Sequence, residues 1–505
     1  MPCKKNVLNL ICFEDFMMLK KVCQQNLPFT ILVFALLLGF LGVSLVNQGM
    51  GGDSFVYSSI ALNMAHGIGS LWTPNYTKTV FPVFYEHPGL SFWLESFFFK
   101  ILGSGFYVEK IYCAVTAAFT LVFTCKICRL ISNRKISTGQ FWLPVLVWLL
   151  MPINTYAFKH NLPQNTLTAF VTAASYYLLC FYLLDKRKYL YLTISALFIV
   201  AAIFANGSTA LYPLSLFFLL WLIFRSPKFI NMLGLTILLL ILVTFFTTLI
   251  LLYKPAHHAM LTYFHTQLWT SIDEHRVGAF SGLKRLNILW LLFNGLLPVI
   301  IISLILYYPT AHRSKHSYVN KLLTACKDKW FIFFLLAGLS ASLPVMLVSR
   351  QQEHYLLQAY PLFTVAFTRL LSPAATLIVT TISQKHQRYV TTLIASSILC
   401  VIAIIVVIAN FGKLGAYKDL LHDTIVIGKI VPKNSIVYLA PSLVTDVKIY
   451  SVMYRYNQIS FSNQPCYEYQ LWPKMTLPRK ISGYHKLALP LQKFTLYQKN
   501  VSTNK

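Results

Sequence analysis

Long apolar stretches recur along almost the whole chain, and they limit its possible folds more than any other feature. A helix needs roughly 20 apolar residues to cross a bilayer. Only 11% of the 505 residues are charged, whereas soluble domains carry about a quarter. The sequence therefore predicts an all-α polytopic membrane protein with about eleven transmembrane helices. The predicted spans are 27–47, 107–130, 138–152, 165–184, 189–205, 208–225, 229–252, 287–308, 330–348, 355–371 and 390–410.

Positive charges fall mainly in alternate loops between these spans. Because cytoplasmic loops are enriched in lysine and arginine, this alternation places residues 1–26 inside the cell and residues 411–505 outside it. Topology and contact with anionic membrane lipids explain the net charge of +28. No signature of a nucleic-acid-binding module accompanies it, and we expect no nucleic-acid partner. The loops expected inside read "CRLISNRK", "DKRK", "RSPK", "AHRSKHSYVNKLLTACKDK" and "QKHQR".

The first outer loop, residues 48–106, contains two segments with helical spacing that are too short to cross the membrane. They are residues 53–66 and 90–102, joined by a stretch rich in glycine and proline that supplies turns. We expect both helices to lie in the membrane interface. The second helix should place its polar side chains in one stripe, formed by Ser91, Glu95 and Lys100.

After residue 410 the sequence changes from long apolar runs to short alternating ones. Such alternation is typical of half-buried strands. We predict that residues 411–505 form a small extracytoplasmic α/β domain. Its expected strands lie in "SIVYLAPS", "NQISFS" and "FTLYQKN", and its expected helix lies in "AYKDLLHDTIVIGKI".

Acidic residues are scarce, with only 15 aspartates and glutamates in the chain, so those near the membrane need a reason. Asp53 stands at the start of the first outer-loop helix. It could cap that helix, or it could act as a general base that faces a cavity. Glu86 and His87 precede Pro88 and Gly89 at the second helix, where a simple turn is the alternative. Because Asp53 and the Glu86–His87 motif lie in the same loop, we favour a shared functional role for them.

The later outer loop, residues 253–286, is rich in histidine and basic residues that could hold a phosphate through charge-assisted hydrogen bonds. No metal-ligand spacing stands out, so we predict no metal site. Use of a divalent metal as a cofactor stays an open alternative. The chain has neither a P-loop nor a dinucleotide-binding glycine motif. Outside the cytoplasm there is no nucleotide sugar, so an activated donor should arrive as a lipid phosphate. The candidate phosphate-binding residues of this loop are His257, His258, His265, His275, Arg276, Lys284 and Arg285.

Residues 50–103 carry the strongest similarity to a known family. There "MGGDSFVYSSIALNMAHG" and "FYEHPGLSFWLESFFFKILG" resemble an acid-plus-tyrosine opening and a Glu-basic-Pro-Pro motif. These are motifs of the GT-C class of integral membrane glycosyltransferases, in the group of protein O-mannosyltransferases, lipid A aminoarabinose transferases and lipopolysaccharide-core glycosyltransferases. Weaker matches continue in the family's order to about residue 371, through "FANGSTALYPL", "YFHTQLWTSIDEHRVG", "NGLLP" and "HYLLQAYPLF".

The resemblance implies a GT-C fold in which residues 27–410 form the catalytic membrane domain and the donor is a polyprenyl-phosphate sugar. It places Asp53 at the family's catalytic acid position. Glu86 and His87 fall where the family shapes its donor sugar and lipid-phosphate site. The substrate-binding residues expected with Asp53 are Tyr57, Glu86, His87, Arg276, Arg350 and His354.

Three positions depart from the family's pattern. Ser54 follows Asp53 where many members carry a second acid, and Gly89 replaces the second proline of the later motif. Asn165, or Gln164 beside it, stands where an acid of the second outer loop is often found. These departures bear on metal use and on substrate identity more than on the class of reaction.

Together these features predict a glycosyltransferase that moves a sugar, with inversion, from a polyprenyl phosphate to lipid A, lipopolysaccharide, another glycan or a protein. The active site and residues 411–505 would face the periplasm, in a bacterial inner membrane. An O-antigen polymerase or ligase is one alternative, although such enzymes depend chiefly on arginines in their outer loops. A lipid-linked glycan transporter is another, but it should have polar residues deep in its spans, and residues 229–252 have almost none that are charged.

Overall fold

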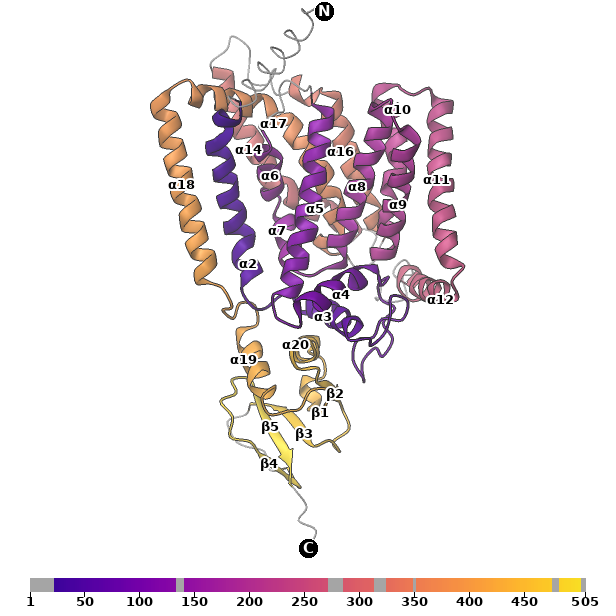
Figure 1. Cartoon of the computed structure of the whole chain (residues 1–505), viewed down its shortest axis with the longest axis vertical. Helices are drawn as coiled ribbons and strands as arrows, with labels where there is room; N and C mark the ends of the chain where they lie inside the picture. The colour runs from indigo at the N-terminus through magenta and orange to yellow at the C-terminus, as the bar shows by residue number, and fades with distance from the viewer. Residues whose placement is uncertain are drawn as a thin grey trace, which may run out of the picture.

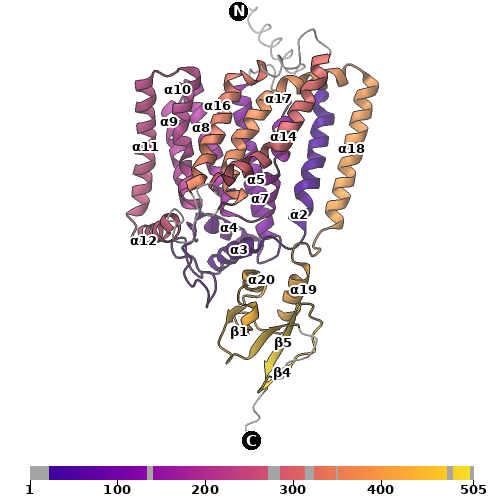
Figure 2. The ribbon, with the colours of Figure 1, turned by 180° about the vertical axis from the view of Figure 1, so that it is seen from behind.

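The computed structural model of the chain describes residues 22–132, 140–270, 285–312, 324–347, 351–474 and 481–500. A bundle of long helices forms the larger part, and a small α/β domain lies at one end of it (Figure 1). The reverse view shows the same two parts, with α3 and α4 between them (Figure 2). The turns from α10 to α11 and from α17 to α18 lie at the end of the bundle away from the α/β domain (Figure 1). This separation agrees with the predicted sides of the "RSPK" and "QKHQR" loops.

The helices of the larger part follow one another in an almost unbroken series. They are a first helix Val22–Val46, which ends as α2 (Val43–Val46), then α3 (Gly52–Ala65), α4 (Leu90–Leu102), α5 (Val108–Ile131), α6 (Trp142–Leu149), α7 (Pro152–Lys159), α8 (Pro163–Leu183), α9 (Lys188–Asn206), α10 (Leu216–Phe224), α11 (Phe229–Leu251), α12 (Lys254–Tyr263), α14 (Asn287–His312), α16 (Lys329–Ser342), α17 (Tyr360–Ser383) and α18 (His386–Ala409).

In the described part of the chain, nine helices are long and apolar enough to cross a membrane. They confirm the prediction of an all-α polytopic membrane protein. The predicted span 208–225 is a shorter apolar helix, Ser208–Phe224. The predicted span 138–152 falls on α6 and on the start of α7 at Pro152, where a proline cannot continue the preceding helix's hydrogen bonds. The number of about eleven spans therefore stays a prediction.

Two outer helices show how the sequence suits a lipid surrounding. Only Met232, Leu239 and Val243 are buried in α11, and only Ser396 and Ala403 in α18. The remaining side chains of both helices are mainly apolar and partly or fully exposed. A helix that is apolar on all sides is expected in a large core or in a membrane. The exposed side chains of these two helices are therefore suited to contact with lipid.

Both short helices expected in the first outer loop are present as α3 and α4. They pack against each other and lie across the end of the bundle that faces the α/β domain (Figure 1). α3 is buried on nearly all sides, because α4 covers one side and the α/β domain another. The predicted polar stripe of α4 was wrong in part: Ser91 and Glu95 are buried, and Lys100 is exposed.

The α/β domain contains a five-stranded sheet with the order β2-β1-β3-β5-β4. β1 runs parallel to β2 and β3, whereas β5 runs antiparallel to β3 and β4. The three expected strands and the expected helix are β1, β2, β5 and α19; β3, β4 and α20 were not predicted. The bounds are α19 (Lys418–Ile427), β1 (Ile436–Leu439), α20 (Val447–Asn457), β2 (Ser460–Ser462), β3 (Tyr469–Pro473), β4 (Tyr484–Lys486) and β5 (Phe494–Lys499).

The α/β domain is fixed to the bundle through a polar and ionic contact of α20. Arg455 Nη2 donates to Glu109 Oε2 of α5 at 2.6 Å, and both side chains are only 1% exposed. Arg455 also donates to the carbonyl oxygens of Ser104 at 3.2 Å and Gly105 at 2.9 Å. Because a buried charge needs a partner and hydrogen bonds, this arrangement sets the position of α20 against the first outer loop.

Candidate active site

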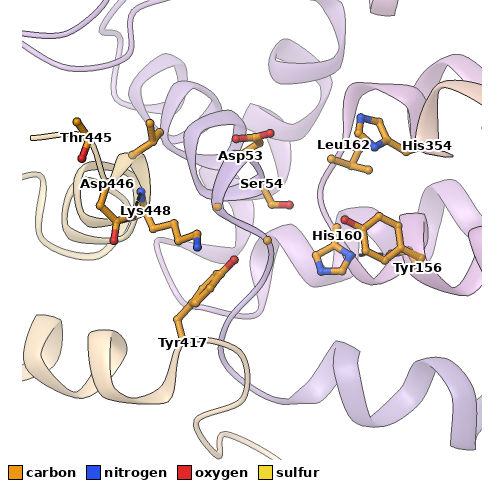
Figure 3. Close-up of a pocket in the computed structure, with 13 residues that line it drawn as sticks. Asp53, Ser54, Tyr156, His160, Leu162, His354, Tyr417, Thr445, Asp446 and Lys448 are labelled. Carbon is orange, nitrogen blue, oxygen red and sulfur yellow. Dashed lines mark hydrogen bonds between the residues drawn. The ribbon is translucent and has the colours of Figure 1, made fainter. Parts of the chain in front are cut away.

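A pocket of about 470 Å³ opens at the N-terminal end of α3, where the bundle and the α/β domain meet (Figure 3). Asp53 and Ser54 line it from α3, and His160 lines it from the end of α7. His354 borders it from the turn before α17, and Lys448 borders it from the start of α20. Residues nearly 400 positions apart in sequence therefore share one cavity.

Two glycines let the chain pass through this crowded place. A Cβ atom on Gly51 would lie 3.1 Å from His160 Cδ2, and one on Gly52 would lie 3.1 Å from Lys448 Cγ. Both distances are shorter than ordinary contacts between such atoms. The Gly51–Gly52 pair thus brings Asp53 between α7 and α20, which explains why the sequence has two glycines before the acid.

Asp53 is the second residue of α3, and Gly51 occupies the N-cap position. The Asp53 side chain makes no capping hydrogen bond within the described residues, and it is exposed to the pocket. Asp53 is therefore not the N-cap residue of α3, although its negative charge suits the first turn of a helix. It is positioned to meet a molecule that enters the pocket.

One helical turn after Asp53, Tyr57 pairs with His87 of the second motif. The Tyr57 hydroxyl lies 3.1 Å from His87 Nε2, and the Tyr57 ring stacks on Phe92 with 5.6 Å between ring centres. Loss of water around His87, helped by the nearby His354, lowers the pKa of His87 to about 4. The His87 ring is therefore neutral at neutral pH. It can exchange a hydrogen bond with Tyr57, but it carries no positive charge.

Electrostatics confirm that the first-loop residues lie together. The pKa of Tyr57 is raised well above its usual value by burial and then by the negative charge of Asp53, with a smaller effect of Glu86. Tyr57 is therefore a permanent hydroxyl donor. His354 both borders the pocket and influences His87. The structure thus brings together five of the seven predicted site residues: Asp53, Tyr57, Glu86, His87 and His354.

The other two predicted residues, Arg276 and Arg350, lie outside the described residues. The described part of the loop that contains Arg276 nevertheless reaches the first loop. The His258 ring of α12 meets the Tyr85 ring edge-on, with 5.8 Å between the ring centres. α12 therefore contacts the chain directly beside Glu86.

Glu95 is a buried acid that the sequence analysis assigned to a surface stripe. It is 1% exposed, and Asn161 Nδ2 lies 2.8 Å from each of its carboxyl oxygens. The same Asn161 nitrogen lies 3.1 Å from Ser58 Oγ of α3. Burial raises the pKa of Glu95 to about 8, so this carboxyl is largely protonated at neutral pH. It joins α4 and α3 to the turn before α8, close behind the pocket.

Asn165 stands where the resemblance would place a further acid, and it has a positioning role in this fold. Its side-chain nitrogen donates to the carbonyl oxygens of Ala157 at 3.1 Å and His160 at 2.8 Å. These bonds hold the turn that presents His160 to the pocket. Among the described residues, no three histidine, cysteine, aspartate or glutamate side chains gather closely enough to hold a metal ion.

His160, Tyr417 and Lys448 also border the pocket, and the sequence analysis did not select them as site residues. His160 was visible as a histidine of the second outer loop, expected to lie outside. Tyr417 and Lys448 lie in the α/β domain, where no motif marked them. The packing of α20 against α3 brings Lys448 to the pocket, and the bridge between Gln48 and Leu414 brings Tyr417 there.

Two solved structures of one protein, ArnT from Cupriavidus metallidurans, have a similar fold. ArnT from Cupriavidus metallidurans bound to undecaprenyl phosphate superposes with a TM-score of 0.62 at 12% identity, over 94% of this chain and 98% of that one. The same protein in the apo state gives a TM-score of 0.55 at 13% identity, over 84% and 83% of the two chains. No protein-family profile and no curated protein sequence matches this chain. The shared architecture nonetheless shows the GT-C fold that the sequence motifs led us to expect, and this chain is a membrane protein of that fold.

Proposed function

We propose that this protein is a membrane glycosyltransferase that moves a sugar from a polyprenyl-phosphate donor to an acceptor outside the cytoplasm. One observation carries the proposal: the exposed Asp53 carboxylate faces a pocket one helical turn from the Tyr57–His87 pair. The similarity in fold to ArnT bound to undecaprenyl phosphate supports the class of donor. A lipid-linked donor also fits a site placed at the end of a bundle of membrane helices.

In this reaction a nucleophilic oxygen of the acceptor attacks the anomeric carbon of the donor sugar. The bond from that carbon to the phosphate oxygen breaks, and polyprenyl phosphate leaves with the electron pair. A single displacement of this kind inverts the anomeric centre. When the nucleophile is a hydroxyl, its proton passes to the Asp53 carboxylate, which acts as a general base.

The donor occupies the side of Asp53 on which Tyr57 and His87 lie. Tyr57 keeps its proton, so its hydroxyl can donate to an oxygen of the phosphate or the sugar. His87 is neutral, and it orients Tyr57 rather than balancing phosphate charge. Positive charge for the leaving phosphate is assigned to Arg276 and Arg350 of the later outer loops, and His354 of the pocket is a further phosphate partner.

The protein would act in a bacterial inner membrane, with Asp53 and the α/β domain on the periplasmic face. The basic turns at the opposite end of the bundle support this orientation. The lipid-linked donor would reach the site from the outer leaflet, and acceptors that fit this location are lipid A, lipopolysaccharide, other glycans and proteins.

The test uses the full chain in lipid nanodiscs. It is given undecaprenyl phosphate that carries a tritium-labelled hexose or pentose, together with an envelope extract from a strain that lacks the gene. We expect label to enter the envelope fraction while an equal amount of undecaprenyl phosphate is released. Absence of both transfer and undecaprenyl phosphate binding, in protein that remains folded, would refute the proposal.

A further inference from the structure

The α/β domain supplies one wall of the pocket, and Lys448 is the positive group of that wall. Lys448 extends from α20 toward the middle of the pocket (Figure 3), and its ammonium lies 5.2 Å from the centre of the Tyr417 ring. Within the described residues it forms no salt bridge. Its neighbour Asp446 accepts the Lys448 backbone N–H at 3.1 Å and caps α20. The ammonium charge is therefore directed into the pocket without a fixed counter-charge.

The opposite wall offers neutral hydrogen-bonding atoms. His160 Nδ1 lies 2.7 Å from the carbonyl oxygen of Tyr156. A carbonyl oxygen only accepts, so Nδ1 carries the hydrogen. Burial lowers the pKa of His160, which keeps the ring neutral and leaves Nε2 as an acceptor. This nitrogen lies near the Gly51 turn, 3.7 Å from where a Cβ on Gly51 would stand.

Ser54 adds an unpartnered hydroxyl at the same place. Its side chain lines the pocket and is only 1% exposed, yet its Oγ has no hydrogen-bond partner among the described residues. Buried polar atoms are almost always satisfied, and an exception calls for an explanation. A bound molecule that gives or receives a hydrogen bond here provides one.

We propose that this pocket binds the acceptor, and that the acceptor carries a phosphate group held by Lys448. The acceptor's nucleophilic hydroxyl then lies between Asp53 and His160, and Ser54 hydrogen-bonds the acceptor beside it. A phosphate near Lys448 would form an ion pair with the ammonium, which forms no salt bridge among the described residues. The carboxylate of Asp53 repels the phosphate and attracts the hydroxyl, so the two ends of the pocket fix the direction of the acceptor. This assignment rests on the function proposed above.

The experiment extends the nanodisc transfer assay with the envelope extract as acceptor. Lys448→Gln is expected to raise the acceptor KM roughly tenfold, because a charge-assisted hydrogen bond is lost, while binding of undecaprenyl phosphate stays unchanged. Treating the extract with phosphatase, inactivated before the donor is added, should impose a similar loss on the wild type and little further loss on Lys448→Gln. Inorganic phosphate should inhibit the wild type more than this variant. If free phosphate inhibits and phosphatase treatment has no effect, the site binds free phosphate and the acceptor assignment is wrong.

Two further variants keep the inference falsifiable. Lys429→Gln changes an exposed lysine of the same domain outside the pocket, and it should leave the acceptor KM unchanged. Ser54→Ala should raise the acceptor KM several-fold without lowering the melting temperature, because it removes a hydroxyl that the folded protein does not satisfy. If transfer occurs but Lys448→Gln behaves like Lys429→Gln, the phosphate-bearing acceptor is refuted and the glycosyltransferase function stands. If no transfer or donor binding occurs in any preparation, the function itself is wrong.

Discussion

The two ends of α3 are built in opposite ways, although α20 of the α/β domain packs along both. At the C-terminal end, polar side chains are buried and most of their polar atoms are paired, although Tyr76 Oη, Glu109 Oε1 and Arg455 Nε have no hydrogen-bond partner among the described residues. The side chain of Asn63 donates to the carbonyl oxygen of Tyr76 at 2.7 Å and accepts from the Tyr454 hydroxyl at 3.2 Å. Close by, Arg455 and Glu109 form their buried ion pair. We call this buried end the closed end of α3.

The N-terminal end of α3 leaves its polar groups open. Asp53 is exposed, Ser54 Oγ lacks a hydrogen-bond partner, and Lys448 forms no salt bridge among the described residues. A chain selected for stability alone would pair or remove such groups, and functional sites are where proteins depart from that rule. The comparison teaches that α20 has two roles. Its last turn attaches the α/β domain, and its first turn completes a binding site.

Breaking the closed end should have the largest effect on stability. Arg455→Met leaves Glu109 buried without its partner, which typically costs 3–5 kcal/mol. We expect a strongly lowered melting temperature in nanodiscs and faster proteolysis of the α/β domain. Replacing both partners, by Arg455→Met with Glu109→Leu, should recover much of the loss. The control is Lys188→Met, which removes an exposed ion pair with Asp185 and should cost less than about 1 kcal/mol. Equal effects of both single variants would contradict the structural role of the buried pair.

The buried acid behind the site should make stability depend on pH. The pKa of Glu95 is about 8 in the folded chain against 4.5 when exposed, so the folded state holds a proton that the unfolded state loses. Burying Glu95 therefore costs the folded state least below pH 4.5, where the carboxyl is protonated in both states. Between pH 4.5 and about 8, the free energy of unfolding falls as pH rises, by at most about 1.4 kcal/mol per pH unit. Glu95→Gln should flatten the thermal unfolding profile over this window. An unchanged slope would place the pH dependence elsewhere.

Substitutions of the residues on the donor side of the pocket should have smaller effects, and these should appear in the donor KM. Glu86→Gln and His87→Ala are each expected to raise the donor KM by about tenfold, since each loses roughly one hydrogen bond's worth of binding. Folding and the acceptor KM should change little. His66→Ala is the matched control, because His66 is an exposed histidine at the closed end of α3. Wild-type donor kinetics in both first-loop variants would reduce their motif to a structural turn.

The sequence predicted the fold because its determinants are local. Apolar runs mark membrane helices whatever they pack against, and the first outer loop keeps Asp53, Tyr57, Glu86 and His87 within 35 residues. The α/β domain was harder, since all of its strands have three to six residues and gain their stability from neighbouring strands. Glu95 was assigned to the wrong side of α4 because an interfacial helix can turn its polar face to water or to protein. Spacing alone does not distinguish these surroundings.

The acceptor side of the pocket could not be predicted for a different reason. Lys448 approaches Asp53 through the docking of α20 on α3, and Tyr417 through the pairing of residues 412–415 with residues 46–48. Both are contacts between distant parts of the chain. No periodicity or motif encodes such a contact. The Gly51–Gly52 pair was the one local trace of it, because both glycines make room for side chains of other elements.

The central claim is that the open end of α3 serves catalysis and does not stabilise the fold, and Asp53→Asn tests it most directly. Asparagine keeps the size and polarity of the side chain but cannot accept a proton. Transfer and melting temperature are measured on the same nanodisc preparation. We predict an unchanged melting temperature with a 10²–10⁴-fold loss of transfer, the range typical of general-base catalysis. Near wild-type transfer, or a loss that merely follows a lowered melting temperature, would contradict the claim.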